Sequence, residues 1–158
     1  MHEGRLLRGA VINSLIGGIA MKLILIGICV VMFGATGLQA QRHPYKVVFD
    51  LTGRDSLEQM AVMRWVKEIS TANPTAELEV VMYGKGFELV MPEKSTRKAE
   101  VVEAIKNPNV SFRVCEVAMR SNKVERSQLL EGVKTVPDGI YEIISKQREG
   151  WGYIKVAR

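Results

Sequence analysis

The chain has 158 residues, a length that suits one globular domain, and its 22 basic and 17 acidic residues give a formal net charge of +5 at pH 7. This excess is small and the two signs are interspersed, which argues against a nucleic-acid-binding protein. Two cysteines and two histidines, with no CxxC or HExxH motif, also argue against a disulfide framework and the common zinc sites.

The first 40 residues have the pattern of a signal peptide. Arg5, Arg8 and Lys22 precede an apolar run at 23–35, and the segment closes on Ala40. We expect cleavage after Ala40, a mature domain at 41–158 with a net charge of +3, and a periplasmic or secreted protein. A start at Met21 would make residues 1–20 an upstream extension. The alternative is an uncleaved membrane anchor, but the run is shorter than the roughly 20 apolar residues that span a bilayer.

The mature part alternates between strand and helix patterns. In chain order, we predict a strand at 45–51, a helix at 56–72, a strand at 77–83, a helical turn at 87–91, a helix from 95 or 96 to about 107, a strand at 110–115, short helices at 116–121 and 127–130, a short strand within 132–137, a helix at 138–149 and a strand at 151–156. Such alternation predicts a single α/β domain with a mostly parallel sheet of about five strands, covered on both faces.

The helices differ in how much apolar surface they carry. We expect Ala99, Val102 and Ile105 to face inward from one helix, and Ile140, Tyr141 and Ile144 from another. In the helix at 56–72, an apolar stripe contains Ala61, Val62, Trp65, Val66 and Ile69, while Leu57, Met60 and Met63 lie outside it. A helix that is apolar on more than one face is either deeply buried or shared with another subunit. In a small domain we favour the second, so we expect a homo-oligomer.

Cys115 is the strongest candidate for chemistry, because it closes a predicted strand and precedes a predicted helix. Ligands of open α/β sheets gather at the carboxyl ends of the strands, and a helix N-terminus favours a thiolate. Arg113 and Arg120 would support the thiolate and Glu116 would oppose it. We expect a partly exposed thiol. The alternative is an inert cysteine that packs as a small hydrophobe.

Other chemistry finds little support in the sequence. After cleavage Cys115 is the only cysteine, so no internal disulfide can form. His43 lies beside the predicted cleavage site, at the start of the mature chain. Because chain termini are poorly ordered, we do not expect His43 to act as a base for Cys115. The loop Gly84-Lys85-Gly86 closes another predicted strand and is a weak candidate for lining a site at the same edge of the sheet.

Five segments, read together, resemble the DsrE/DsrF-like (YchN-like) family. They are Val80-Val-Met-Tyr-Gly-Lys-Gly86, Val110-Ser-Phe-Arg-Val-Cys115, Leu129-Leu-Glu-Gly-Val133, Val136-Pro-Asp-Gly-Ile140 and Gln147-Arg-Glu-Gly-Trp-Gly-Tyr-Ile-Lys155. The resemblance implies a flavodoxin-like three-layer domain that assembles as trimers or hexamers. In sulfur-relay members a cysteine at the position of Cys115 carries sulfur as a persulfide. Val117 stands where many relatives have a small polar residue.

These observations favour an exported sulfur-handling protein in which Cys115 accepts and donates sulfane sulfur, with no metal or organic cofactor. Its partners would be copies of itself and a sulfur donor or acceptor protein. Any enzymatic activity would at most resemble that of a sulfurtransferase. One alternative is a non-catalytic oligomeric binding module with a structural cysteine. Another is a thiol redox sensor, which the lack of a second cysteine in the mature chain disfavours.

Overall fold

The computed structural model describes residues 44–157. The predicted signal peptide, its cleavage site, Cys29 and His43 lie outside the described residues. The strands are β1 (Lys46–Leu51), β2 (Glu77–Met82), β3 (Val110–Cys115), β4 (Lys134–Val136) and β5 (Gly152–Val156). They form one five-stranded sheet in the order β4-β3-β2-β1-β5, and all four pairings are parallel. The predicted α/β class and parallel sheet are confirmed.

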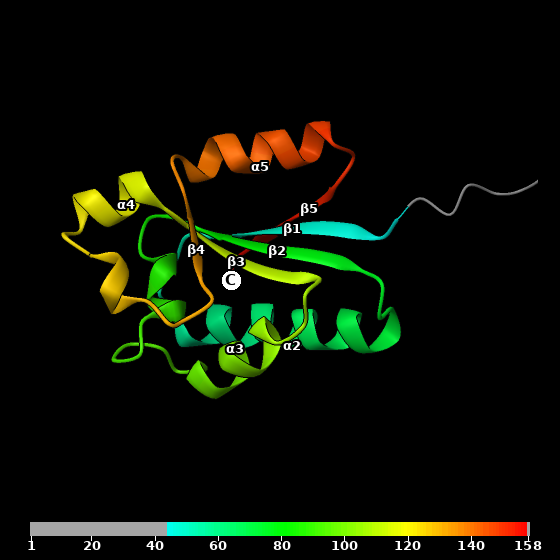
Figure 1. The fold of residues 1–158 in the computed structure, drawn as a ribbon, viewed down its shortest axis with the longest axis horizontal. Coiled ribbons are helices and arrows are strands. Elements are labelled where there is room, and N and C mark those ends of the chain that lie inside the picture. Colours follow the sequence, from blue (N-terminus) through cyan, green and yellow to red (C-terminus); the bar gives the residue numbers. More distant parts are fainter. Residues whose placement is uncertain (1–43, 158) are drawn as a thin grey trace, which may run out of the picture. The chain divides into compact units, whose positions relative to one another are not determined.

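Helices cover both faces of the sheet, as Figure 1 shows. The helices α2 (Ser56–Ala72) and α3 (Lys98–Ile105) lie on one face, and α5 (Gly139–Arg148) lies on the other. The short α4 (Glu116–Ser121) follows β3 directly, and the 3₁₀ turns Gly86–Val90 and Arg126–Gln128 complete the connections. Within residues 44–157, none of the helices has the length and apolar character needed to cross a membrane.

The two faces of the sheet have different chemistry. Towards α2 and α3 the strands present large buried side chains, and Phe49 stacks on Trp65 with ring centroids 6.3 Å apart. Because side chains alternate along a strand, the intervening residues point to the α5 face, and these include Asp50, Glu79 and Arg113. Among residues 44–157, the buried apolar cluster on that face consists of Val48, Val81 and Ile143, with the partly buried Tyr83 and Trp151 packed against it. The domain therefore has one apolar core and one largely polar layer.

This asymmetry overturns the predicted inward face of α5. Ile140, Tyr141 and Ile144 are 55%, 67% and 42% exposed, while Ile143 is buried. The prediction assumed that α5 covers an apolar sheet face. Instead, Ile143 of α5 packs against Val48 and Val81, and Lys146 of α5 lies 4.0 Å from Glu79.

The predicted interiors of α2 and α3 also need correction. In α2, Leu57 and Met60 are exposed as expected, but Met63 is buried against the core. In α3, Ala99 and Val102 are exposed, against the prediction, and Val101 is buried instead. The segment before α3 is tied to α2. The backbone N–H and the hydroxyl of Thr96 both donate to Oε1 of the buried Gln59, at 3.0 and 2.9 Å. This anchor fixes where α3 begins.

Candidate functional site

Cys115 ends β3 and is the N-cap residue of α4, as the sequence predicted. Its side chain is only 5% exposed and contacts the main core cluster. The expectation of a partly exposed thiol is therefore wrong. Cys115 is the only free cysteine within residues 44–157.

A cavity of about 250 Å³ opens beside Cys115 at the carboxyl edge of the sheet. Its wall comes from the ends of β2 and β3, from α4 and from the start of α5. The lining residues are Tyr83, Gly84, Cys115, Val117, Ala118, Ser121, Asn122, Asp138 and Ile140. Val117 and Ile140 are exposed apolar residues, and Cys115 itself belongs to the wall, so a small molecule in the cavity would lie next to the cysteine.

The N-terminus of α5 fits closely over Cys115. A Cβ atom added to Gly139 would lie 3.1 Å from Cβ of Cys115 and 3.3 Å from Cγ1 of Val81. Asp138 caps this helix, and its Oδ1 accepts hydrogen bonds from the backbone N–H groups of Ile140 and Tyr141 at 2.8 and 3.1 Å. The absence of a side chain at residue 139 thus lets the capped helix end approach the thiol.

The loop Gly84-Lys85-Gly86 lies at the same edge of the sheet. Gly84 has a φ of +58°, a conformation that other residues rarely adopt. A Cβ on Gly86 would collide with the carbonyl oxygen of Leu51, so the loop passes directly over the end of β1. The side-chain amide of Asn122 donates to the carbonyl oxygens of Gly84 and Ala118, at 3.5 and 2.7 Å, and so links this loop to α4.

The other residues predicted around Cys115 have different surroundings. Gly84 shares the cavity, but Lys85 is exposed and Gly86 is buried against the end of β1. Nε of Arg113 lies 3.4 Å from the buried Glu79. Glu116 accepts a hydrogen bond from Thr135 at 2.9 Å, and its other oxygen lies 3.9 Å from Arg120. Neither arginine lines the cavity.

Sequence reasoning missed a buried polar cluster next to this cavity. Asp50 is 3% exposed. Its Oδ2 accepts hydrogen bonds from the hydroxyls of Tyr153 and Tyr83, at 2.7 and 3.2 Å, and Nζ of Lys155 lies 3.1 Å away. Lys155 also contacts Thr52 at 3.2 Å. Tyr83 belongs both to this cluster and to the wall of the cavity.

The cluster keeps its two phenols protonated. The pKa of Tyr153 is raised to about 12, first by its hydrogen bond to Asp50 and then by burial and the Asp50 charge. Burial and the same carboxylate also raise the pKa of Tyr83. The signal that could have revealed this cluster was Asp50, a charged residue within the apolar stretch at 47–51.

Comparison with known proteins identifies the architecture. No family model and no curated protein matches the sequence. Among solved structures, protein MTH1491 of unknown function from Methanobacterium thermoautotrophicum shares 29% identity, with a TM-score of 0.66 over 70% of this chain and 98% of that chain. YchN from E. coli matches with a TM-score of 0.58 over 72% of this chain and 99% of YchN, at 11% identity. The domain has the YchN fold.

A third YchN-like structure, BT1422 of unknown function from Bacteroides thetaiotaomicron, matches with a TM-score of 0.58 at 12% identity, over 70% of this chain and 93% of that chain. The YchN fold is the one implied by the resemblance to the DsrE/DsrF-like family. These matches support that resemblance at the level of the fold, and the role of Cys115 belongs to the proposal below.

A second polar group lies on the same face of this YchN-like domain, further from the carboxyl edge. The hydroxyl of Ser111 donates to Oε2 of Glu79 at 3.0 Å, and Nζ of Lys146 lies 4.0 Å from that oxygen. Burial raises the pKa of Glu79, and hydrogen bonding to Glu142 raises it further, while Lys146 and Arg113 act against both. This group ties α5 to β2 and β3.

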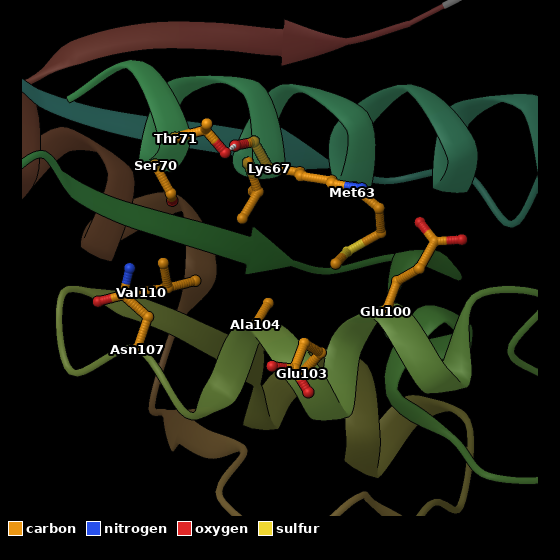
Figure 2. Close-up of a pocket in the computed structure, with 10 residues that line it drawn as sticks. Met63, Lys67, Ser70, Thr71, Glu100, Glu103, Ala104, Asn107 and Val110 are labelled. Carbon is orange, nitrogen blue, oxygen red and sulfur yellow. Dashed lines mark hydrogen bonds between the residues drawn. The ribbon is translucent and has the colours of Figure 1, made fainter. Parts of the chain in front are cut away.

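A second cavity, of about 290 Å³, lies on the opposite face between α2 and α3 (Figure 2). Met63, Val66, Ala104 and Val110 supply apolar walls, and the charged residues Lys67, Glu100 and Glu103 are exposed. Its polar groups include the buried hydroxyl of Ser70, which has no hydrogen-bond partner among the described residues. No group of three or more potential metal ligands occurs in the described part of the chain. Cys115 remains the better candidate, since its cavity contains a nucleophile.

Proposed function

We propose that this chain is an exported sulfur-handling protein, in which Cys115 takes up sulfane sulfur as a persulfide and passes it on. The observation that carries the proposal is the position of Cys115, at the carboxyl end of a central strand and in the wall of a cavity. The YchN fold and the resemblance to sulfur-relay proteins support it. The predicted signal peptide supports a periplasmic or secreted location.

The chemistry requires one nucleophile and no oxidant. The Cys115 thiolate attacks the outer sulfur of a hydrodisulfide, R–S–S–H, and a new S–S bond forms while the S–S bond of the donor breaks. The products are the Cys115 persulfide, which keeps the proton on its outer sulfur, and the thiolate R–S⁻. Transfer to an acceptor thiolate is the same reaction in reverse. No second cysteine lies within residues 44–157 to convert the product into an internal disulfide.

A second function is favoured by the burial of Cys115. A thiol that is 5% exposed and in contact with the core can serve packing alone. The domain would then be a non-catalytic oligomeric binding module. Reactivity of the thiol separates the two functions.

Peptide mass spectrometry after treatment with a small organic hydrodisulfide, R–S–S–H, tests the proposal. We expect the Cys115 peptide to gain the mass of one sulfur atom, which dithiothreitol removes, and we expect Cys115→Ser to abolish the gain. Reading the modification from this peptide excludes any contribution from Cys29. If native protein gains no sulfur at Cys115 while the urea-unfolded chain does, the carrier function fails and the packing function stands.

We also propose a homo-oligomer, a trimer or hexamer, with the exposed Leu57 and Met60 of α2 in the interface. Leu57→Glu and Met60→Glu should then lower the mass seen by analytical ultracentrifugation. Val102→Glu places the same charge on an exposed apolar residue of α3 and should leave assembly unchanged. A monomer at micromolar concentration in the unsubstituted protein would refute the proposal.

A further inference from the structure

The cavity beside Cys115 has an unusual charge for a site that binds sulfur compounds. Many small sulfur donors are anions. Among the nine residues that line the cavity, the one charged side chain is the carboxylate of Asp138, and none is cationic. The basic residues close to Cys115 in sequence do not compensate, because Arg113 lies against Glu79 and Arg120 lies near Glu116.

At the N-terminus of α5 and at Lys155, a carboxylate already offsets the positive potential. The first-turn N–H groups of α5 at Ile140 and Tyr141 already donate to Asp138. The ammonium of Lys155 lies 3.1 Å from Asp50 and reaches the cavity wall only as a contact with the Tyr83 ring, 5.5 Å from its centre. An anion entering the cavity would lose water and meet the like charge of Asp138, and no cationic side chain lines the cavity to offset either cost.

The remaining wall suits an uncharged molecule. Val117, Ala118 and Ile140 are apolar, while Ser121 and Asn122 are polar and neutral. The volume of about 250 Å³ is far above the roughly 10–15 Å³ that a cavity needs to hold one water molecule. The cavity therefore accommodates a small molecule or the tip of a larger one.

We propose that this cavity selects small uncharged reactants for Cys115 over anionic ones, and that Asp138 sets this selectivity. If the proposed function holds, the sulfur donor is an uncharged hydrodisulfide rather than thiosulfate or an anionic polysulfide chain. The charge selectivity itself does not depend on sulfur transfer.

Iodoacetamide and iodoacetate test the selectivity, because they are similar in size and differ by one negative charge. Their alkylation rates at Cys115 are measured on the full chain by peptide mass spectrometry and divided by their rates with 2-mercaptoethanol. We expect an excess preference for iodoacetamide of about fivefold, the effect of one unit charge across several ångströms of partly hydrated surroundings. The excess should shrink as salt is added, because Asp138 is exposed.

Asp138→Asn keeps the helix cap, since asparagine caps about as well as aspartate. It should remove most of the excess preference by raising the iodoacetate rate, with a smaller change for iodoacetamide. The matched control is Asp55→Asn, which changes the N-cap of α2 and does not line the cavity. It should leave the ratio unchanged.

The proposal is overturned if Cys115 shows the same ratio as 2-mercaptoethanol, if it reacts with neither reagent, or if Asp138→Asn leaves the ratio unchanged. A persistent selectivity without sulfur uptake would refute the carrier function and leave the charge selectivity standing. Sulfur uptake with no selectivity would refute the charge selectivity and leave the carrier function standing.

Discussion

Substitution of the buried carboxylate by Asp50→Asn tests whether the polar layer contributes to stability. The change removes the negative charge and keeps one oxygen that can accept hydrogen bonds. A hydrogen bond to a charged group contributes about 1.5–3 kcal/mol and a neutral one about 1 kcal/mol. Each of the two phenol bonds, from Tyr83 and Tyr153, therefore loses about 1 kcal/mol.

The ion pair with Lys155 adds less, because the lysine side chain is 41% exposed and solvent screens the charge. The ion pair therefore contributes less than about 1 kcal/mol to the free energy of unfolding. The total loss in the free energy of unfolding is about 2–3 kcal/mol, which lowers the Tm of a domain of this size by roughly 10 °C.

The same substitution changes the response to alkaline pH. A tyrosine whose pKa is raised on folding contributes stability that is complete below its unfolded pKa, about 10, and is lost as pH rises through its folded pKa. For Tyr153 the folded pKa is about 12. The native protein should therefore lose stability between about pH 10 and 12, and Asp50→Asn should reduce that loss.

Urea unfolding followed by circular dichroism measures the first effect, and tyrosinate absorbance against pH measures the second. Asp55→Asn is the control, since it changes an exposed aspartate and keeps the cap of α2. It should alter stability less than Asp50→Asn does, because the cap of α2 is kept. An Asp50→Asn protein with the native urea midpoint and an unchanged tyrosinate titration would refute the reasoning.

Two further predictions concern the contacts of α5. Gly139→Ala inserts a methyl group against buried atoms at 3.1 and 3.3 Å, and its overpacking cost exceeds the gain in helix propensity by about 1 kcal/mol. Gly152→Ala, whose new Cβ would meet only ordinary contacts, should be nearly neutral by thermal unfolding, and equal stability of the two variants would contradict the close fit. Because the pKa of Glu79 is raised above 4.5, its contribution to stability is complete below pH 4.5 and falls as pH rises through the folded pKa. Glu79→Gln should remove that fall in a pH series of thermal unfolding, whereas Glu77→Gln, on the exposed end of the same strand, should not; a Glu79→Gln series that parallels the native one would count against a buried, destabilised carboxylate.

The elements with strong local signals were predictable from the sequence. Asp55 caps the helix that was predicted to start at residue 56, and Asp138 caps the helix that was predicted to start at residue 138. The strand at 110–115 has the predicted ends. These features depend on residues a few positions apart, so the local pattern is sufficient.

The predictions that failed depend on the partner surface across the layer. The rotation of α5 could not be deduced from Ile140, Tyr141 and Ile144, because the polarity of the sheet face beneath them follows from strand pairing. The Asp50 cluster joins β1 to a tyrosine and a lysine 103 and 105 residues away. The exposure of Cys115 depends on how closely Gly139 approaches it. Each of these is a long-range contact.

The order of the strands has a consequence for the chain before it is complete. β1 lies inside the finished sheet, between β2 and β5, although it is the first strand to be synthesised and β5 is the last. Until residues 152–156 are made, the hydrogen-bonding groups along one side of β1 have no partner, and the strand carries Val47, Val48, Phe49 and Leu51. An unpaired apolar edge of this kind pairs readily with other chains. A premature stop or proteolytic cut before Gly152 would thus produce an aggregation-prone fragment with an open β1 edge.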